Sequence, residues 1–181
     1  MNLQKVNDEV FIALDPIVKL GPAELDFLKL QARSNQRKRA RICAHKTNDD
    51  ALHEMVIAMS AESYIHPHSH AGKSESFHIV EGLVKVVVFD DLGDIVDVVE
   101  LGDMSTGRNF YYRLSGTAYH TLLIETDFLV VHEVTNGPFQ RDKTALATFA
   151  PSEALAEEAR SYIQKVACRA ADFKQVAEKG K

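Results

Sequence analysis

Apolar and polar residues alternate in short runs across the middle of the chain, from residue 39 to residue 135. Successive side chains of a β-strand point to opposite faces, so this alternation predicts strands with one buried face. The runs recur about every 8–12 residues between turn residues, which is typical of a β-sandwich or barrel. The predicted strands cover residues 39–45, 52–60, 84–90, 95–101, 110–113, 118–125 and 128–135.

Amphipathic helices are predicted on both sides of this strand-rich region. Pro22 follows Gly21 and suits the first turn of a helix, so we expect a helix over residues 22–33. Near the C-terminus, apolar residues recur at spacings of three and four. This periodicity predicts a helix over residues 152–177, with Ser152 as its N-cap.

The same patterns divide the chain into three parts. Residues 6–14 alternate and are expected to form an edge strand, which precedes the first helix. We therefore expect an N-terminal strand and helix at 1–36, a β-barrel at 37–150 and a C-terminal helix at 151–181. The whole chain of 181 residues can bury a substantial core.

Composition excludes two classes of partner. The net charge of −5 and the pI near 5.9 argue against a nucleic-acid binder, which usually presents a basic surface. No apolar run approaches the roughly 18 residues of a membrane span, so no membrane partner is expected. The two cysteines, Cys43 and Cys168, stand far apart without a CxxC spacing, which favours reduced thiols and a cytoplasmic location.

The chemistry of the chain concentrates in the segment from Tyr64 to Asp91. His66, His68 and His70 stand at every second position, so an extended segment points all three to one side. Four residues separate Glu75 from the last histidine, and six residues separate Gly82 from Glu75. Imidazoles and a carboxylate that converge from paired strands are suitable ligands for a divalent transition metal.

This spacing resembles the first motif of the cupin superfamily, which is His-x-His, three or four residues, Glu, six residues and Gly. The glycine that opens that motif is replaced by Glu62. The resemblance implies an all-β fold, the double-stranded β-helix or jelly-roll barrel of cupins, here with a short N-terminal helix and a C-terminal amphipathic helix. It also implies His68, His70 and Glu75 as metal ligands, with His66 outside the ligand pair.

The second cupin motif supplies the fourth ligand, and its match here is weaker. Gly116 stands before His120 at a spacing one residue too long, the proline of the motif is missing, and Ile124 replaces its asparagine. His120 still begins an alternating strand and can face inward. The order of the motif favours His120, and His132, which is also on a predicted strand, is the alternative ligand.

Several segments between residues 37 and 152, among them KSESFHIVEG at 73–82 and EVTNGPF at 133–139, resemble the WbuC-like family of cupin-fold metalloproteins. Members of that family occur in bacterial surface-polysaccharide clusters. Three imidazoles and one carboxylate suit one divalent transition metal, and Fe, Mn, Ni, Co and Zn all fit. Four protein ligands leave open positions for water or a substrate.

Residues outside the motif are candidates for binding a small anionic or sugar-like ligand. Arg39 and Arg41 share one strand face and could bind phosphate or carboxylate, or could simply protect a solvated edge strand. Lys73 lies in the loop between ligands and could reach an anion. Tyr119, like Tyr112, could stack on a sugar ring or pack in the core.

Three functions fit these features. The first is a metal-dependent enzyme on a sugar-derived anion, with Lewis-acid chemistry of the isomerase or epimerase type, in surface-polysaccharide metabolism. The second is a non-catalytic metal- and carbohydrate-binding module, and the third is a metal-dependent dioxygenase. The fold by itself decides between none of them. The long C-terminal helix and the N-terminal strand favour a homodimer.

Overall fold

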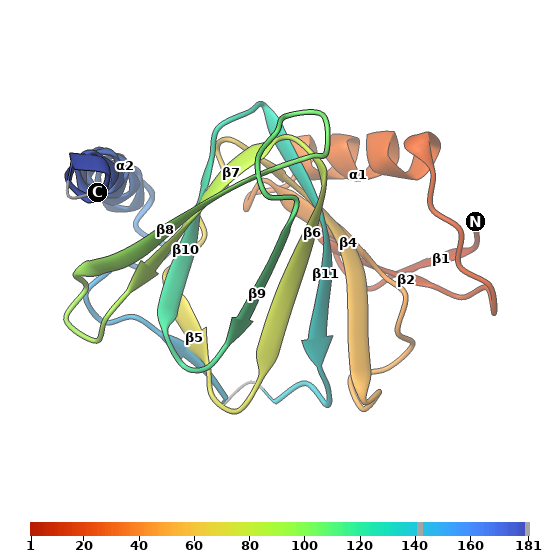
Figure 1. Ribbon diagram of the computed structural model, residues 1–181. Helices are drawn as coiled ribbons and strands as arrows, with labels where there is room; N and C mark the ends of the chain where they lie inside the picture. The colour runs from red at the N-terminus through yellow and green to blue at the C-terminus, as the bar shows by residue number, and fades with distance from the viewer. Residues whose placement is uncertain (141–142, 180–181) are drawn as a thin grey trace.

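Two β-sheets stacked face to face form the body of the protein (Figure 1). The computed structural model describes residues 1–140 and 143–179. The seven-stranded sheet has the order β1-β2-β3-β4-β11-β6-β9, and its strands are Leu3–Lys5, Val10–Ala13, Arg39–Cys43, Leu52–Ser60, Phe128–Asn136, Ser74–Glu81 and Tyr111–Ser115. The five-stranded sheet has the order β12-β5-β10-β7-β8, and its strands are Thr144–Leu146, His68–His70, Tyr119–Ile124, Leu83–Phe89 and Ile95–Gly102.

The main core lies between the inner faces of the two sheets. Alternate residues of each strand point into it, and the fully buried members include Val84, Val86, Leu129 and Val131. Burial of one face of each sheet is the main source of stability, because apolar burial contributes about 25 cal/mol per Å². The predicted all-β jelly-roll fold, with one helix before the barrel and one after it, is confirmed.

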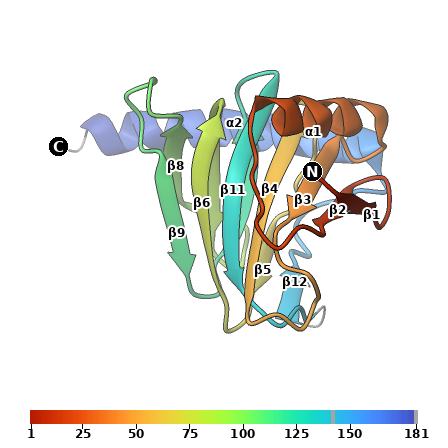
Figure 2. The same ribbon diagram turned by 90° about the vertical axis from the view of Figure 1, so that its right-hand side faces the viewer.

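Helix α1, Pro22–Ser34, covers the outer face of the seven-stranded sheet (Figure 2). Leu28 and Ala32 are buried against Ile42 and Ala58. The helix begins where the sequence predicts, because Pro22 occupies its first turn and the Gly21 N–H donates to the Glu24 carboxylate at 2.9 Å.

Helix α2, Ala156–Lys179, packs on the outer face of the five-stranded sheet, on the opposite side of the molecule from α1 (Figure 1). Val166 and Ala170 are buried against Val87 and Phe89. The helix begins four residues later than predicted, because Ser152 closes a turn in which its carbonyl accepts from the Leu155 N–H at 3.0 Å. Residues 180 and 181 of the predicted C-terminal part lie outside the described residues. No helix of the described chain is long and apolar enough to span a membrane.

The single edge strand predicted at residues 6–14 is instead two short strands, β1 and β2, that pair antiparallel. Asn7 causes the break, because its side-chain carbonyl accepts from the N–H groups of Glu9 and Val10 at 2.8 and 2.9 Å and closes a turn. Strand β2 then pairs in parallel with β3, so the N-terminal segment extends the barrel sheet.

Gly82 makes the tight connection between β6 and β7, with φ at +93°. A Cβ at this position would collide with the Phe128 carbonyl and with the Thr126 hydroxyl. We expect Gly82→Ala to lower the free energy of unfolding by about 3 kcal/mol, from left-handed strain and overpacking together. Gly72→Ala is the control for strain alone, since φ is +69° but no atom lies within 4 Å of the added carbon. Equal losses for both variants in urea unfolding would contradict the role of the contact.

Candidate metal centre

Four side chains from three strands meet inside one end of the barrel. His68 and His70 lie on β5, Glu75 lies on β6, and His120 lies on β10, where it is the register partner of His68. Each of the four can offer one nitrogen or oxygen atom such that all four atoms lie within 4.8 Å of one another. This geometry could hold a metal ion.

Each of the three imidazoles is held through its Nδ1 atom. Nδ1 of His68 donates to the His66 carbonyl at 2.9 Å, and Nδ1 of His120 donates to the Ala118 carbonyl at 3.3 Å. Nδ1 of His70 lies 3.3 Å from the Thr144 hydroxyl. Because a carbonyl can only accept, the proton of His68 and of His120 resides on Nδ1 in the neutral ring. Their Nε2 atoms are left with a lone pair, which is the form that binds a metal.

Glu75 is the buried acid of the cluster, with 5% of its surface exposed. Its two oxygens lie 3.1 Å from Nε2 of His120 and 3.5 Å from Nε2 of His70. Burial would raise the pKa of Glu75, but its hydrogen bonds with His120 and His70, together with the electrostatic influence of His120 and His68, hold it well below its usual range. Burial and the neighbouring His120 lower the pKa of His68 to about 4. At pH 7 the cluster therefore contains an ionised Glu75 carboxylate and a neutral His68.

The remaining histidines of the motif region lie apart from this cluster. His66, which the resemblance puts outside the ligand pair, is 8% exposed, and its Nε2 donates to the Ala147 carbonyl at 3.0 Å. Pro67 follows it, directly before β5 begins. His78 is exposed on the outer face of β6, as its parity predicts. His132, the alternative fourth ligand, lies on the same outer face beside Glu54, at 3.8 Å.

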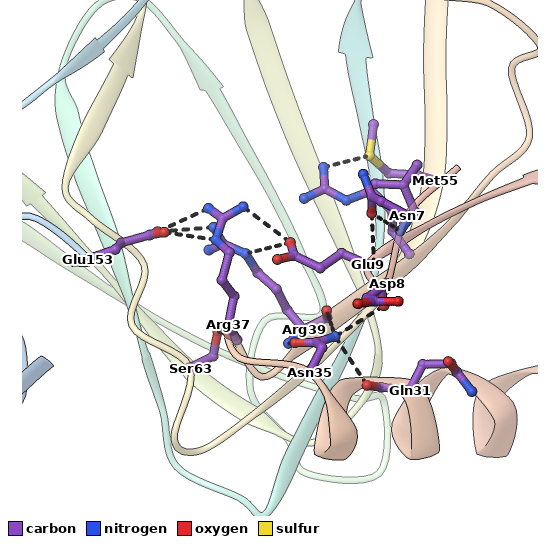
Figure 3. A network of polar contacts seen from close by, with 12 residues as sticks. Asn7, Asp8, Glu9, Gln31, Asn35, Arg37, Arg39, Met55, Ser63 and Glu153 are labelled. Atoms are coloured by element: carbon purple, nitrogen blue, oxygen red, sulfur yellow. Dashed lines mark hydrogen bonds and ion pairs between the residues drawn. The ribbon is translucent and has the colours of Figure 1, made fainter. Parts of the chain in front are cut away.

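Arg39 faces inward but is occupied by the protein itself (Figure 3). Its guanidinium lies 3.0 Å from Glu153 and 3.8 Å from Glu9, and Arg37 binds the same two carboxylates. These four residues tie the N-terminal segment and β3 to the segment before α2. The structure therefore gives Arg39 a place in this ion-pair network, which leaves it less available to bind a ligand.

Tyr119 lies away from the cluster, whereas Lys73 lies in the loop between two of its members. His120 points inward, so Tyr119 points to the outer face of β10, where it packs edge-on against Phe149 at 5.5 Å between ring centres. The structure thus brings Tyr119 to α2 and not to the cluster. Lys73 lies in the loop between His70 and Glu75, and its ammonium donates to the Pro138 carbonyl at 3.1 Å.

Arg41 lies on the inner face of β3, and two further polar residues, Glu133 and Tyr112, face inward with it. From the sequence, Tyr112 is a candidate for sugar stacking or core packing, whereas Glu133 is not among the candidates. Glu133 follows Leu129 and Val131 at every second position of β11, so parity alone could have identified it. Tyr112 lies on β9, is 8% exposed and belongs to the main core. Burial raises the pKa of Glu133 to about 8, with the charge of Glu75 adding to the effect and Arg41 opposing it.

Comparisons with known proteins support the fold. A family model described as a domain of unknown function (DUF6016) matches residues 20–101. No curated protein matches the chain. The structure of protein SO0799 from Shewanella oneidensis is 14% identical with a TM-score of 0.55, and the match covers 76% of this chain and 90% of that one.

Two further solved structures match the chain with lower TM-scores. The cupin domain of Cnp3 from Schizosaccharomyces pombe is 13% identical with a TM-score of 0.43, over 56% of this chain and 66% of that one. Oxalate decarboxylase from Lactobacillus farciminis is 15% identical with a TM-score of 0.44, over 60% of this chain and 31% of that one. At such low identity, likeness to a solved structure bears on the fold alone. The case for a metal centre therefore rests on the four side chains themselves.

Proposed function

We propose that the protein binds one divalent transition metal through His68, His70, Glu75 and His120. The observation that carries this proposal is the convergence of three imidazoles and one carboxylate within 4.8 Å inside the barrel. Packing three imidazoles together and burying the Glu75 carboxylate both raise the free energy of the folded state, unless these four groups share a cation or a proton. A bound divalent ion would supply Lewis-acid polarisation of an oxygen on a small ligand.

The ligand that we favour is a small, sugar-derived anion, converted by chemistry of the isomerase or epimerase type in surface-polysaccharide metabolism. This finer proposal depends on the WbuC-like sequence segments and on two cationic side chains, Arg41 on the inner face of β3 and Lys73 in the loop between His70 and Glu75. In such a reaction His68 and His120 would orient the metal through their Nδ1 hydrogen bonds, and the surrounding apolar core would exclude water. A non-catalytic binding module and a dioxygenase remain the competing functions.

Metal analysis of the protein, purified without added metal, tests the proposal. We expect one equivalent of a transition metal per chain, removable by a chelator and restored by dialysis against Mn, Fe, Co, Ni or Zn salts. Less than a tenth of an equivalent after every such dialysis would contradict the metal centre. Sugar turnover without oxygen uptake supports the isomerase class, oxygen uptake with bound iron supports the dioxygenase, and ligand binding without turnover supports the module.

A further inference from the structure

The strand that carries His68 and His70 is held mainly from its outer side. Strand β12 is the edge of the five-stranded sheet and pairs with every residue of β5, with Thr144 opposite His70 and Leu146 opposite His68 (Figure 2). On the other side of β5, the described residues pair with β10 at one position, His68 with His120. The placement of both histidines of β5 therefore depends largely on β12.

Hydrogen bonds extend this contact beyond both ends of β5. The Ala71 N–H donates to the Lys143 carbonyl at 2.9 Å, and the Ala147 N–H donates to the Pro67 carbonyl at 2.8 Å. His66 adds a side-chain bond, from its Nε2 to the Ala147 carbonyl at 3.0 Å. These bonds lie before and after the two candidate ligands of β5, so the backbone around both ligands is fixed by the segment that contains β12.

Thr144 also contacts a candidate ligand through its side chain. Its hydroxyl lies 3.3 Å from Nδ1 of His70, whereas His68 and His120 meet backbone carbonyls at the same atom. A hydroxyl can accept from Nδ1–H, which leaves the lone pair that binds a metal on Nε2. Loss of a partner of this kind weakens metal binding by about 10–100-fold in metalloproteins. Thr144 can therefore fix the orientation of the His70 ring.

The far end of the same segment is fixed by ion pairs beside the start of β3 (Figure 3). Oε2 of Glu153 lies 2.8 Å from Nε of Arg37, and its Oε1 lies 3.0 Å from Nη2 of the buried Arg39. Nearby, the Pro151 carbonyl accepts from the Tyr64 hydroxyl at 2.9 Å. These contacts hold the end of the segment against the barrel.

Between its two ends the segment buries little apolar surface. Leu146 is 59% exposed, and Thr148 is also exposed. Ala147 is buried, and Phe149 packs edge-on against Tyr119. Edge segments with few buried apolar contacts open locally at a low free energy. The polar contacts at the far end therefore influence how often β12 separates from β5.

We propose that the segment Thr144–Glu153 is a strap that positions the metal-binding histidines of β5 from outside the barrel. Thr144 is the positioning residue for His70, and Glu153 is the latch that keeps β12 paired with β5. The effects on metal affinity and metal release rest on the proposed metal centre. The effects on the His70 ring and on backbone amide exchange do not.

Variants at position 144 test the orientation of His70. Thr144→Val keeps the shape of the side chain but removes the hydroxyl, so the dissociation constant for Zn²⁺, measured by competition with a chromophoric chelator, should rise by about tenfold or more. Thr144→Ser keeps a hydroxyl and should restore most of the affinity. In the chelator-treated protein, the ¹⁵N chemical shifts of the His70 imidazole should change in Thr144→Val and recover in Thr144→Ser. Serine and valine variants with the same affinity and the same shifts would overturn this role.

Glu153→Gln tests the latch, because it removes the charge that pairs with both arginines. In the chelator-treated protein, hydrogen exchange of the Ala71 and Ala147 amides should become about threefold faster. Release of Zn²⁺ to a saturating chelator should accelerate by a similar factor, since two of the four ligands lie on β5. The dissociation constant should not change, because the strap is closed nearly all of the time in both proteins.

Glu9→Gln is the matched control for the latch. Glu9 lies 3.1 Å from Arg37 and 3.8 Å from Arg39, but it belongs to the N-terminal segment and not to the strap. This variant should lower the melting temperature through loss of its ion pairs, while amide exchange of Ala71 and Ala147 and release of Zn²⁺ stay as in the wild type.

Failure of the strap and failure of the metal centre give different results. If the protein binds no Zn²⁺, the metal centre is wrong, and faster amide exchange in Glu153→Gln but not in Glu9→Gln still supports the strap. Equal amide exchange in these two variants overturns the latch. Faster amide exchange in Glu153→Gln with an unchanged rate of Zn²⁺ release overturns the link between the strap and the metal.

Discussion

Replacement of His68 and His70 together by alanine is expected to abolish metal binding. Both Nε2 atoms of β5 disappear, and Glu75 and His120 alone give too few ligands for a stable transition-metal site. In the wild type, metal at about 1,000 times its dissociation constant should add about 4 kcal/mol to the free energy of unfolding. The double variant should gain none of this. Elemental analysis and thermal unfolding with and without metal measure the two effects.

The matched control for this experiment is a second pair of histidines replaced by alanine. His78 and His132 are register partners on the outer face of neighbouring strands β6 and β11. They lie in the same sheet as Glu75 but on its opposite face, so the His78→Ala/His132→Ala protein should keep its metal. Full metal occupancy in the His68→Ala/His70→Ala protein would rule out the proposed centre. Loss of metal from both double variants would point to unfolding instead.

Glu133→Gln is expected to change how stability depends on pH in the chelator-treated protein. Burial raises the pKa of Glu133 from 4.5 to about 8, so between these values the folded state holds a proton that the unfolded state has released. The contribution of Glu133 to stability is therefore fully present below the unfolded pKa and is lost as the pH rises towards about 8. The slope is at most about 1.4 kcal/mol per pH unit.

Glutamine carries no titrating proton, so the variant should lack this slope. The free energy of unfolding of the variant, relative to that of the wild type, should increase as the pH rises from about 5 to about 8. Above about pH 8 this difference in the free energy of unfolding should stay constant. Urea unfolding at several pH values measures the difference. Glu62→Gln is the control, since Glu62 is exposed beyond the end of β4 and should leave the slope unchanged. A slope in Glu133→Gln as steep as in the wild type would contradict a Glu133 that is protonated in the folded state between these pH values.

Much of the fold could be predicted because the alternation along each strand reflects burial of one face. Strand β4 has the predicted bounds, Leu52–Ser60, and the histidine spacing correctly put His68 and His70 on one side and His78 on the opposite face from Glu75. Predictions failed where a local hydrogen bond competed with the pattern. The side chain of Asn7 splits the N-terminal strand, and the turn at Ser152 delays the start of α2.

The ligand-binding candidates show why a sequence predicts the face of a strand on which a residue lies more reliably than it predicts which residues contact it in the fold. Parity with His120 already implies that Tyr119 points away from the centre, and the structure places it against Phe149. Arg39 and Arg41 have the same parity and the same chemistry, and only the structure separates them, because Glu9 and Glu153 come from distant parts of the chain. A partner more than 100 residues away leaves no periodic signal near the arginine.

The sequence by itself determined most of the long strands of the barrel, the faces that their residues occupy and the four side chains that could become metal ligands, because these properties depend on spacings within short segments. Only the tertiary structure decided that the four side chains converge, and that Glu133 lies on the same face of β11 as Thr135, the register partner of Glu75. The reason is physical: the pairing register of β3, β4, β11, β6 and β9 sets those neighbours, and register arises from the packing of the whole sheet against the core.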